Sequence, residues 1–326
     1  MDMGKTIAMT GATGFAGRHA VTELLKRGHR IVALARNPAR ADLPSGAEVI
    51  AGHLDDESAF AKLMRGANAV VHLAGVFAAA RADHYFKYNT SPTRALAEAA
   101  LESGVKRFVF ASSLAAREPK LSPYGASKLA AEQELSKFHG RLQTLILRAP
   151  AIYGPGDRAT LPLFKQLTQR IAFVPGEREQ RFSLLYVKDF ARILADAVEG
   201  EAAGQLELSD GTAGGYGWND LIRVAEATER REIRALFLPK PVAAGVGFLA
   251  AGVAGLTGKA GMMNPGKVRE LYHVDWVARE PQFPLADPTN FSKGFPETLA
   301  WYRAAGWLPP HREAGRNSAF NREAEE

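Results

Sequence analysis

Residues 6–17 read Thr-Ile-Ala-Met-Thr-Gly-Ala-Thr-Gly-Phe-Ala-Gly, an apolar run followed by glycines at positions 11, 14 and 17. The run predicts a strand, the glycines predict a tight turn, and the residues from Phe15 onward predict a helix. Gly11 permits the sharp turn, Gly14 lets the backbone approach a phosphate, and Gly17 lets the helix pack closely on the sheet. The stretch therefore predicts a pyrophosphate site at the N-terminus of a helix.

The glycine spacing alone leaves an alternative. Gly-x2-Gly-x2-Gly differs from the commonest dinucleotide-binding pattern, so an ordinary glycine-rich turn would also match it. The following residues favour the phosphate site, because Val21, Leu24 and Leu25 share one face of the predicted helix and Gly28 ends it. Residues 30–35 then form a second apolar strand, which completes a strand–helix–strand unit of the expected length.

Strands and helices alternate through the first half of the chain. Further strands are predicted at 47–51, 69–73, 107–111 and 142–147, with helices at 57–64, about 92–103 and about 124–138. Near-continuous apolar strands between helices are typical of a parallel sheet covered on both faces. We therefore expect an α/β fold, a Rossmann-type doubly wound parallel sheet with a smaller C-terminal α/β substrate domain. Ligands bind such sheets beyond the carboxyl ends of the strands.

The expected dinucleotide-binding domain covers residues 1–155 and the expected substrate domain covers 156–308. Shorter helices are predicted in the second half, at about 161–170, 188–198, 218–228 and 296–305. The helix at about 188–199 is expected to pack back on the first domain. The polar tail, residues 309–326, is expected to be disordered.

Composition narrows the class of protein. The chain has 326 residues, 46% of them hydrophobic, and no cysteine, which excludes disulfides and thiolate metal sites. No secretory pattern precedes the first strand, so we expect a cytoplasmic protein. The net charge of +6 is scattered, and the eight histidines show no ligand spacing with acids. We therefore expect neither nucleic-acid binding nor a metal site, and a small molecule as substrate.

Residues 241–258 carry no charge and contain many glycines and alanines. The favoured interpretation is a buried or substrate-facing pair of helices. Contact with a membrane surface is a less favoured alternative, and a membrane span is the least favoured, because the segment is short and only weakly apolar.

A Tyr and a Lys stand four residues apart where a helix is predicted to start. At this spacing Tyr124 and Lys128 project from one face. A nearby ammonium would stabilise the phenolate and lower the tyrosine pKa from about 10, so that Tyr124 could exchange a proton with a carbonyl or alcohol oxygen. Ser113 ends the preceding strand and could hydrogen-bond the same oxygen. The alternatives are a surface helix pair and a serine that caps a turn.

The end of the second strand bears on cofactor choice. Arg36 stands where proteins specific for NAD carry an acid that binds the ribose, and its guanidinium could bind a 2′-phosphate instead. We therefore favour NADP(H), with NAD(H) also possible. Asp55 could hydrogen-bond the adenine amine or could cap the next helix, and the sequence leaves both open.

Together these residues resemble the extended short-chain dehydrogenase/reductase superfamily, in its NAD-dependent epimerase/dehydratase-like form. The ordered pieces are residues 10–17, His-Leu-Ala-Gly at 72–75, Asn-Thr-Ser-Pro-Thr at 89–93, Phe-Val-Phe-Ala-Ser-Ser at 108–113, Tyr-Gly-Ala-Ser-Lys at 124–128, and 147–157. Residues 294–303 look like the closing helix of that family. Together, all these matching pieces span almost the whole chain.

The resemblance implies roles for individual residues. Ser113, Tyr124 and Lys128 would form the catalytic set, and Lys128 would also hold the nicotinamide ribose. Ile152 lies just after Pro150, where the family uses backbone groups to hold the carboxamide. Further cofactor contacts are implied for Thr13, Phe15, Ala16, Leu73, Ala74, Gly75 and Asn89. A homodimer is implied by the resemblance alone.

Departures from the family pattern narrow the activity. Leu114, Ala115 and Ala116 follow the active-site hydroxyl where sugar-nucleotide dehydratases carry an acid. Among the branches of the superfamily, the chain then resembles the one that contains dihydroflavonol reductases and 3β-hydroxysteroid dehydrogenases. We therefore expect an oxidoreductase that interconverts a ketone and a secondary alcohol. The alternatives are an NAD-retaining nucleotide-sugar epimerase and a non-catalytic dinucleotide-binding sensor or assembly protein.

Overall fold

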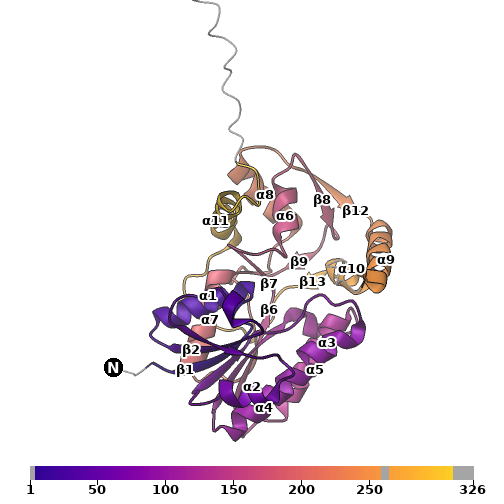
Figure 1. Ribbon diagram of the computed structural model, residues 1–326. Coiled ribbons are helices and arrows are strands. Elements are labelled where there is room, and N and C mark those ends of the chain that lie inside the picture. The colour runs from indigo at the N-terminus through magenta and orange to yellow at the C-terminus, as the bar shows by residue number, and fades with distance from the viewer. Residues whose placement is uncertain (1–3, 258–263, 311–326) are drawn as a thin grey trace, which may run out of the picture.

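The computed structural model describes residues 4–257 and 264–310 (Figure 1). The tail whose disorder was predicted falls outside them, apart from residues 309 and 310. The fold is α/β, as predicted.

A seven-stranded sheet has the order β11-β6-β5-β4-β1-β2-β3, and all its neighbours pair in parallel. Its strands are β1 (Thr6–Thr10), β2 (Arg30–Ala35), β3 (Ala47–Ala51), β4 (Ala69–His72), β5 (Arg107–Ser113), β6 (Gln143–Ala149) and β11 (Gly204–Glu207). The strand order reverses between β1 and β4. Ligands of doubly wound sheets bind at such a switch point, beyond the carboxyl ends of the strands.

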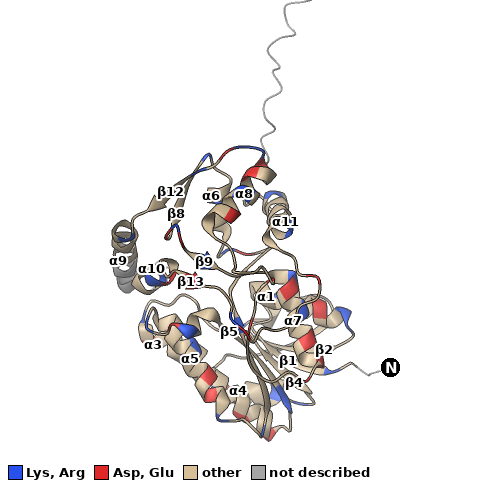
Figure 2. Cartoon of the chain, turned by 180° about the vertical axis from the view of Figure 1, so that it is seen from behind, with Lys and Arg blue, Asp and Glu red and all other residues tan. Residues whose placement is uncertain are grey.

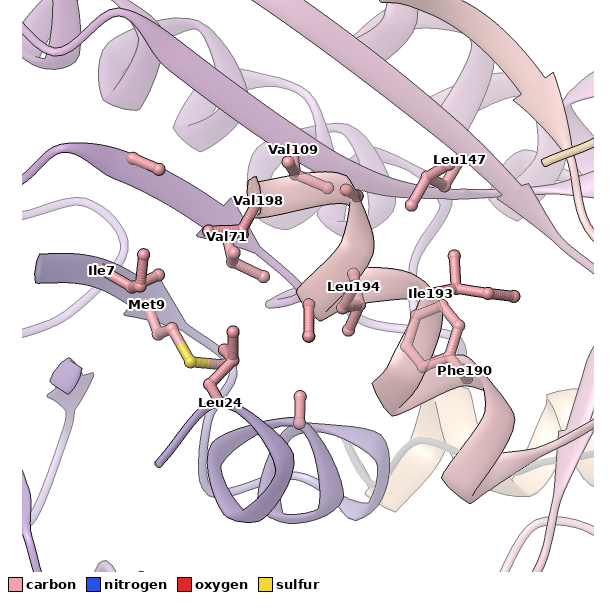
Figure 3. Close-up of a cluster of buried hydrophobic side chains, with 14 of the residues drawn as sticks. Ile7, Met9, Leu24, Val71, Val109, Leu147, Phe190, Ile193, Leu194 and Val198 are labelled. Atoms are coloured by element: carbon pink, nitrogen blue, oxygen red, sulfur yellow. The ribbon is translucent and has the colours of Figure 1, made fainter. Parts of the chain in front are cut away.

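Helices cover both faces of this sheet. They are α1 (Phe15–Lys26), α2 (Glu57–Leu63), α4 (Ser91–Glu102), α5 (Pro123–Ser136) and α7 (Val187–Glu199), while α3 (Ala82–Asn89) packs on α4 and α5. Side chains of α1 and α7 share one buried cluster with the sheet, and those of α2, α4 and α5 share another. Figure 3 shows Phe190, Ile193 and Leu194 of α7 among residues of α1 and the central strands. Helix α7 therefore packs against α1 and the central sheet.

Two elements near the sheet were not predicted. β11 lies within residues 156–308 but extends the central sheet by pairing with β6. It is short, and only Glu207 is buried, so it lacks the apolar run that marks the other strands. Helix α3 was missed because its residues are mostly polar; Tyr85 and Asn89 are its buried members.

The rest of the chain builds a smaller layer above the carboxyl ends of the strands (Figure 1). Its strands are β7 (Ala151–Tyr153), β8 (Ile171–Pro175), β9 (Arg181–Phe182), β10 (Leu184–Tyr186), β12 (Arg234–Leu238) and β13 (Asp275–Trp276). Its helices are α6 (Leu161–Leu167), α8 (Trp218–Glu229), α9 (Lys240–Thr257), α10 (Pro265–Leu271) and α11 (Phe291–Ala304). An aromatic core holds α6 and α11 together, where Phe164 stacks on Phe295 at 5.0 Å between ring centroids.

The uncharged segment differs from its favoured interpretation. It forms one helix, α9, instead of a buried or substrate-facing pair, and Val246 and Leu249 on it are exposed. Glycines and alanines supply too little apolar volume to bury both sides of such a helix. Among the described residues, no helix is both long enough and apolar enough to cross a bilayer.

Candidate active site

The glycine turn between β1 and α1 has the geometry that its sequence predicts. Gly11 has φ +76°, a region that favours glycine, and a Cβ there would lie 2.5 Å from the backbone nitrogen of Ala74. A Cβ on Gly17 would lie 2.1 Å from the Gly11 carbonyl oxygen. Any larger residue at either position would therefore push α1 or the loop after β4 away from β1.

The N-terminus of α1 suits an anion. Gly14 is its N-cap and is exposed, no side chain caps the helix, and its first turn holds no acidic residue. The backbone N–H groups and the positive end of the helix dipole therefore face open space at the switch point of the sheet. A pyrophosphate fits this arrangement, with Thr13, Phe15 and Ala16 beside it.

Asn89 ties the loop after β4 to the helix that carries the tyrosine. Its Oδ1 accepts a hydrogen bond of 2.7 Å from the Val76 backbone N–H. Its Nδ2 donates to the Val76 carbonyl at 3.0 Å and to Ser127 Oγ at 2.9 Å. The amide is thus occupied within the protein. Asn89 lines the pocket, but its position supports a role in holding the loop and α5 together.

His72 is buried beneath this loop. Its Nδ1 lies 2.6 Å from Thr10 Oγ1, and its Nε2 lies 3.1 Å from Thr93 Oγ1. Burial, aided by the nearby positive charge of Lys128, lowers the His72 pKa to about 3. The imidazole is therefore neutral at physiological pH, and it links β1, β4 and α4.

A pocket opens between the carboxyl ends of the strands and the upper layer. Among the residues predicted as a site, it brings together Ala16, Leu73, Gly75, Asn89, Tyr124, Lys128 and Ile152. Sequence reasoning missed Val76, Phe77 and Phe190, which also line it. Phe77 and Phe190 come from a loop and from a helix remote in sequence, so no local pattern marks them.

Tyr124 occupies the first turn of α5. The helix begins after Ser122, whose Oγ accepts a hydrogen bond of 2.9 Å from the Gly125 backbone N–H, and Pro123 occupies its first position. The Tyr85 ring packs edge-on against the Tyr124 ring, with 6.4 Å between centroids. Burial raises the Tyr124 pKa to about 12, and the Ser113 hydroxyl opposes part of that rise. Ser113 also caps a short turn by accepting from the Ala115 N–H at 3.2 Å.

The expected effect of Lys128 on the tyrosine is not observed. The Lys128 ammonium donates a 2.6 Å hydrogen bond to the Ala111 carbonyl and lies 4.2 Å from the centre of the Phe110 ring. Burial lowers the Lys128 pKa to about 7, although the Glu132 carboxylate opposes this. A lysine that is itself only partly charged near neutral pH is a weak source of phenolate stabilisation, so desolvation determines the tyrosine pKa here.

Glu132 lies one turn beyond Lys128 on α5 and is held by a buried network. Its two carboxylate oxygens accept hydrogen bonds of 2.9 and 2.6 Å from the Arg148 guanidinium, and it also accepts one from Ser112. The Arg148 guanidinium thus pairs with both oxygens of the carboxylate, a geometry that fixes its orientation. The network therefore places a fixed negative charge near the lysine.

Two residues expected at the adenosine end lie on the surface. Arg36 follows β2 and is exposed, which leaves its guanidinium accessible to a phosphate. Asp55 is also exposed, but the N-cap of α2 is Asp56, whose Oδ1 accepts a 3.1 Å hydrogen bond from the Ala59 N–H. The capping role considered for Asp55 is therefore wrong by one residue.

Comparison with known proteins places this site in a family. Residues 7–207 match the NAD dependent epimerase/dehydratase family. The chain is 39% identical over 315 residues to a ceramide reductase of Caulobacter vibrioides, covering 94% of this chain and 98% of the relative. It is 28% identical over 237 residues to the UDP-glucose 4-epimerase of Vibrio cholerae, covering 64% of this chain and 72% of the relative.

Solved structures agree on the fold. MoeE5 in complex with UDP-glucuronic acid and NAD superposes with a TM-score of 0.66 at 24% identity, covering 93% of this chain and all of that one. The glycine turn, the parallel sheet and the tyrosine–lysine helix occur here in the order that the sequence resemblance requires. The chain belongs to the NAD dependent epimerase/dehydratase family and is an enzyme of the extended short-chain dehydrogenase/reductase type.

Proposed function

We propose that this enzyme reduces the ketone form of a ceramide-type lipid to a secondary alcohol with NADPH. The observation that carries the proposal is the pocket in which Tyr124 and Lys128 face the loop after β4 and Ile152. The ceramide reductase relative supports the substrate class, because the similarity runs along nearly the full length of both chains.

The tyrosine is suited to donating a proton. With a pKa of about 12 the phenol stays protonated through the physiological range, so Tyr124 can hydrogen-bond a ketone oxygen and protonate it during reduction. Ser113 holds the same oxygen from the end of β5. A bound reduced nicotinamide would supply the hydride to the carbonyl carbon. Charge that develops on the oxygen is thus neutralised by one proton, and the product is an alcohol.

Lys128 and Arg36 would hold the two ends of the cofactor. The Lys128 ammonium lies in the pocket and would donate to the nicotinamide ribose, with Glu132 favouring its charged form. Arg36 would pair with the 2′-phosphate, since its accessible guanidinium offers fork-like hydrogen bonds to a phosphate. NADP(H) is therefore the proposed cofactor, in preference to NAD(H).

The apolar lining supports a lipid over a sugar nucleotide. Val76, Phe77 and Phe190 border the pocket, and the Phe77 side chain is 62% exposed at its edge. A nucleotide-sugar epimerase needs polar contacts to sugar hydroxyls, whereas Val76 and Phe77 offer apolar surface to an alkyl chain. Epimerisation with retained NAD is the function against which the proposal must be tested.

The test compares wild type with Tyr124→Phe. Turnover is followed by NADPH oxidation with a short-chain β-keto amide that is soluble in water, and cofactor binding is followed by nucleotide fluorescence. Loss of the proton donor should lower kcat by about 10²–10⁴-fold while leaving NADPH affinity nearly unchanged. Full activity of the Phe variant would contradict the assignment, and Tyr85→Phe serves as a matched control.

A further inference from the structure

Helix α9 presents an apolar face to solvent. Val242, Val246 and Leu249 follow one another at helical spacing and are 54%, 53% and 75% exposed. Phe248 beside them is 67% exposed. Large apolar side chains gathered on one surface helix mark an interaction site more often than scattered ones do.

The opposite face of α9 packs against α10, and this contact keeps the exposed face turned toward solvent. Ala243 packs with Val268 and Tyr272 of α10 in a small buried cluster. Gly247 is so close to α10 that a Cβ on it would lie 2.9 Å from Val268 Cγ2. The Tyr272 hydroxyl also donates a 2.6 Å hydrogen bond to the Leu238 carbonyl, just before α9. These contacts bury the narrow, small-residue side of the helix.

The charge around this face is positive. Residues 240–257 include Lys240 at the start of α9 and no acidic residue. On α10, Lys267 and Arg269 are exposed, whereas the acid of that helix, Glu270, is buried, accepts a hydrogen bond from Ser122 and pairs with Lys267 at 3.1 Å. In Figure 2 the coloured part of α9 is mostly tan, and it lies next to blue on α10. An apolar face with basic neighbours complements an anionic lipid surface.

A second exposed apolar surface lies on β8 and β12, the strand pair that leads to α9. Ile171 and Phe173 of β8 and Leu236 of β12 are exposed, and Phe173 and Leu236 are direct partners in the parallel register. β12 ends two residues before α9 begins, and both figures show it leading to that helix. The apolar surface of α9 therefore continues along the chain into the β8–β12 pair.

Helix α10 connects α9 to α5, the helix that carries Tyr124. Ser122, the N-cap of α5, hydrogen-bonds Glu270 of α10, and a Cβ on Gly266 would lie 3.0 Å from Ser122 Cβ. Tyr124 follows two residues later. Only α10 thus separates α9 from the start of the helix that carries the proposed proton donor.

We propose that α9, with the exposed face of β8 and β12, docks on the surface of an anionic phospholipid bilayer without crossing it. The enzyme would then take its lipid substrate from that surface, beside the N-terminus of α5. The inference rests on the proposed function for its choice of a lipid surface over a second copy of the chain.

The test is flotation with phosphatidylcholine vesicles that contain or lack phosphatidylglycerol. Wild type should float with the anionic vesicles, and less of it at high salt, because exposed charge pairs are screened. Val246→Asp/Leu249→Asp should lower the bound fraction by about tenfold or more, since it removes two apolar contacts and adds two negative charges. The matched control, Thr22→Asp/Ala61→Asp, adds the same charges to exposed positions on α1 and α2 and should float like wild type.

Two readouts separate this inference from the proposed function. Reduction of the soluble keto amide should be the same in the α9 variant and in wild type, which also shows that the variant is folded. If wild type reduces that amide but does not float, the docking surface is wrong and the proposed function stands. If it floats but reduces no keto amide, the proposed function is wrong and the docking surface stands. Equal flotation of the α9 variant and wild type would overturn the docking inference. So would light scattering that shows a dimer for wild type but not for the α9 variant, if wild type does not bind vesicles.

Discussion

Replacing Lys128 by Met should remove activity yet stabilise the cofactor-free protein. The Lys128 side chain is buried, and its pKa falls from 10.5 in the unfolded chain to about 7 in the fold. Between these values the unfolded chain holds a proton that the folded chain lacks, so the contribution of Lys128 to stability rises with pH through this window. Below pH 7 the charged lysine lowers the free energy of unfolding by the full amount that corresponds to the difference between these two pKa values.

The magnitude follows from the same two pKa values. A displacement of about 3.5 units corresponds to about 5 kcal/mol at pH 6 and to about 2 kcal/mol at pH 9. Loss of the hydrogen bond to Ala111 and of the contact with Phe110 offsets about 2–3 kcal/mol of this gain. Lys128→Met should therefore be more stable than wild type by about 2 kcal/mol at pH 6, which raises Tm by about 4 °C, and should have no advantage at pH 9.

Urea unfolding followed by circular dichroism, at pH 6 and at pH 9, measures both values. Lys106→Met is the matched control, because Lys106 is exposed and its removal should change neither stability nor its pH dependence. If the Lys128→Met variant is less stable than wild type at both pH values, or if its difference from wild type does not change with pH, the reasoning is refuted.

Three further predictions concern other parts of the fold. Arg36→Ala should weaken NADPH binding by about 10–100-fold and leave NADH binding unchanged, because a charge-assisted hydrogen bond to the 2′-phosphate is lost. Arg30→Ala, at the opposite end of β2, is the control, and an equal effect of Arg36→Ala on the binding of both cofactors would exclude a 2′-phosphate site. Because the His72 pKa is about 3 in the fold, the stability that this residue contributes is present above pH 6.5 and is lost as pH falls, by about 3 kcal/mol at pH 4. In denaturant titrations His72→Gln should be less stable than wild type at pH 7 but should lose less stability on acidification, and an equal loss in both proteins would contradict this. Asp56→Ala should lower the free energy of unfolding because it removes the N-cap of α2, whereas Asp55→Ala should leave it unchanged in the same titration.

The parallel sheet and the glycine turn could be predicted because local signals are strong there. Apolar runs mark every buried strand from β1 to β6, and the positions of Gly11 and Gly17 follow from the turn that they allow. β11 lacked such a signal, since its place depends on pairing with β6, which is remote in sequence. Short elements stabilised by tertiary contacts are the ones that pattern reasoning misses.

Two residues that line the pocket could be predicted from the sequence, but their electrostatics could not. Spacing on one helix was sufficient to place Tyr124 and Lys128 together in the pocket. It could not show that burial outweighs their mutual interaction, which raises one pKa and lowers the other. Nor could it show that the Asn89 amide is occupied by Val76 and Ser127, because those partners meet only in the folded chain.

Net hydride transfer is the central claim, and isotope transfer tests it most directly. The enzyme is incubated with the soluble β-keto amide and with NADPH that carries deuterium at both hydrogen positions of the reactive ring carbon, and the masses of the products are measured by mass spectrometry. The account predicts one deuterium in the alcohol and one NADP⁺ formed for each alcohol. A product without deuterium, or cofactor that returns to its starting state while the substrate is isomerised, would contradict it.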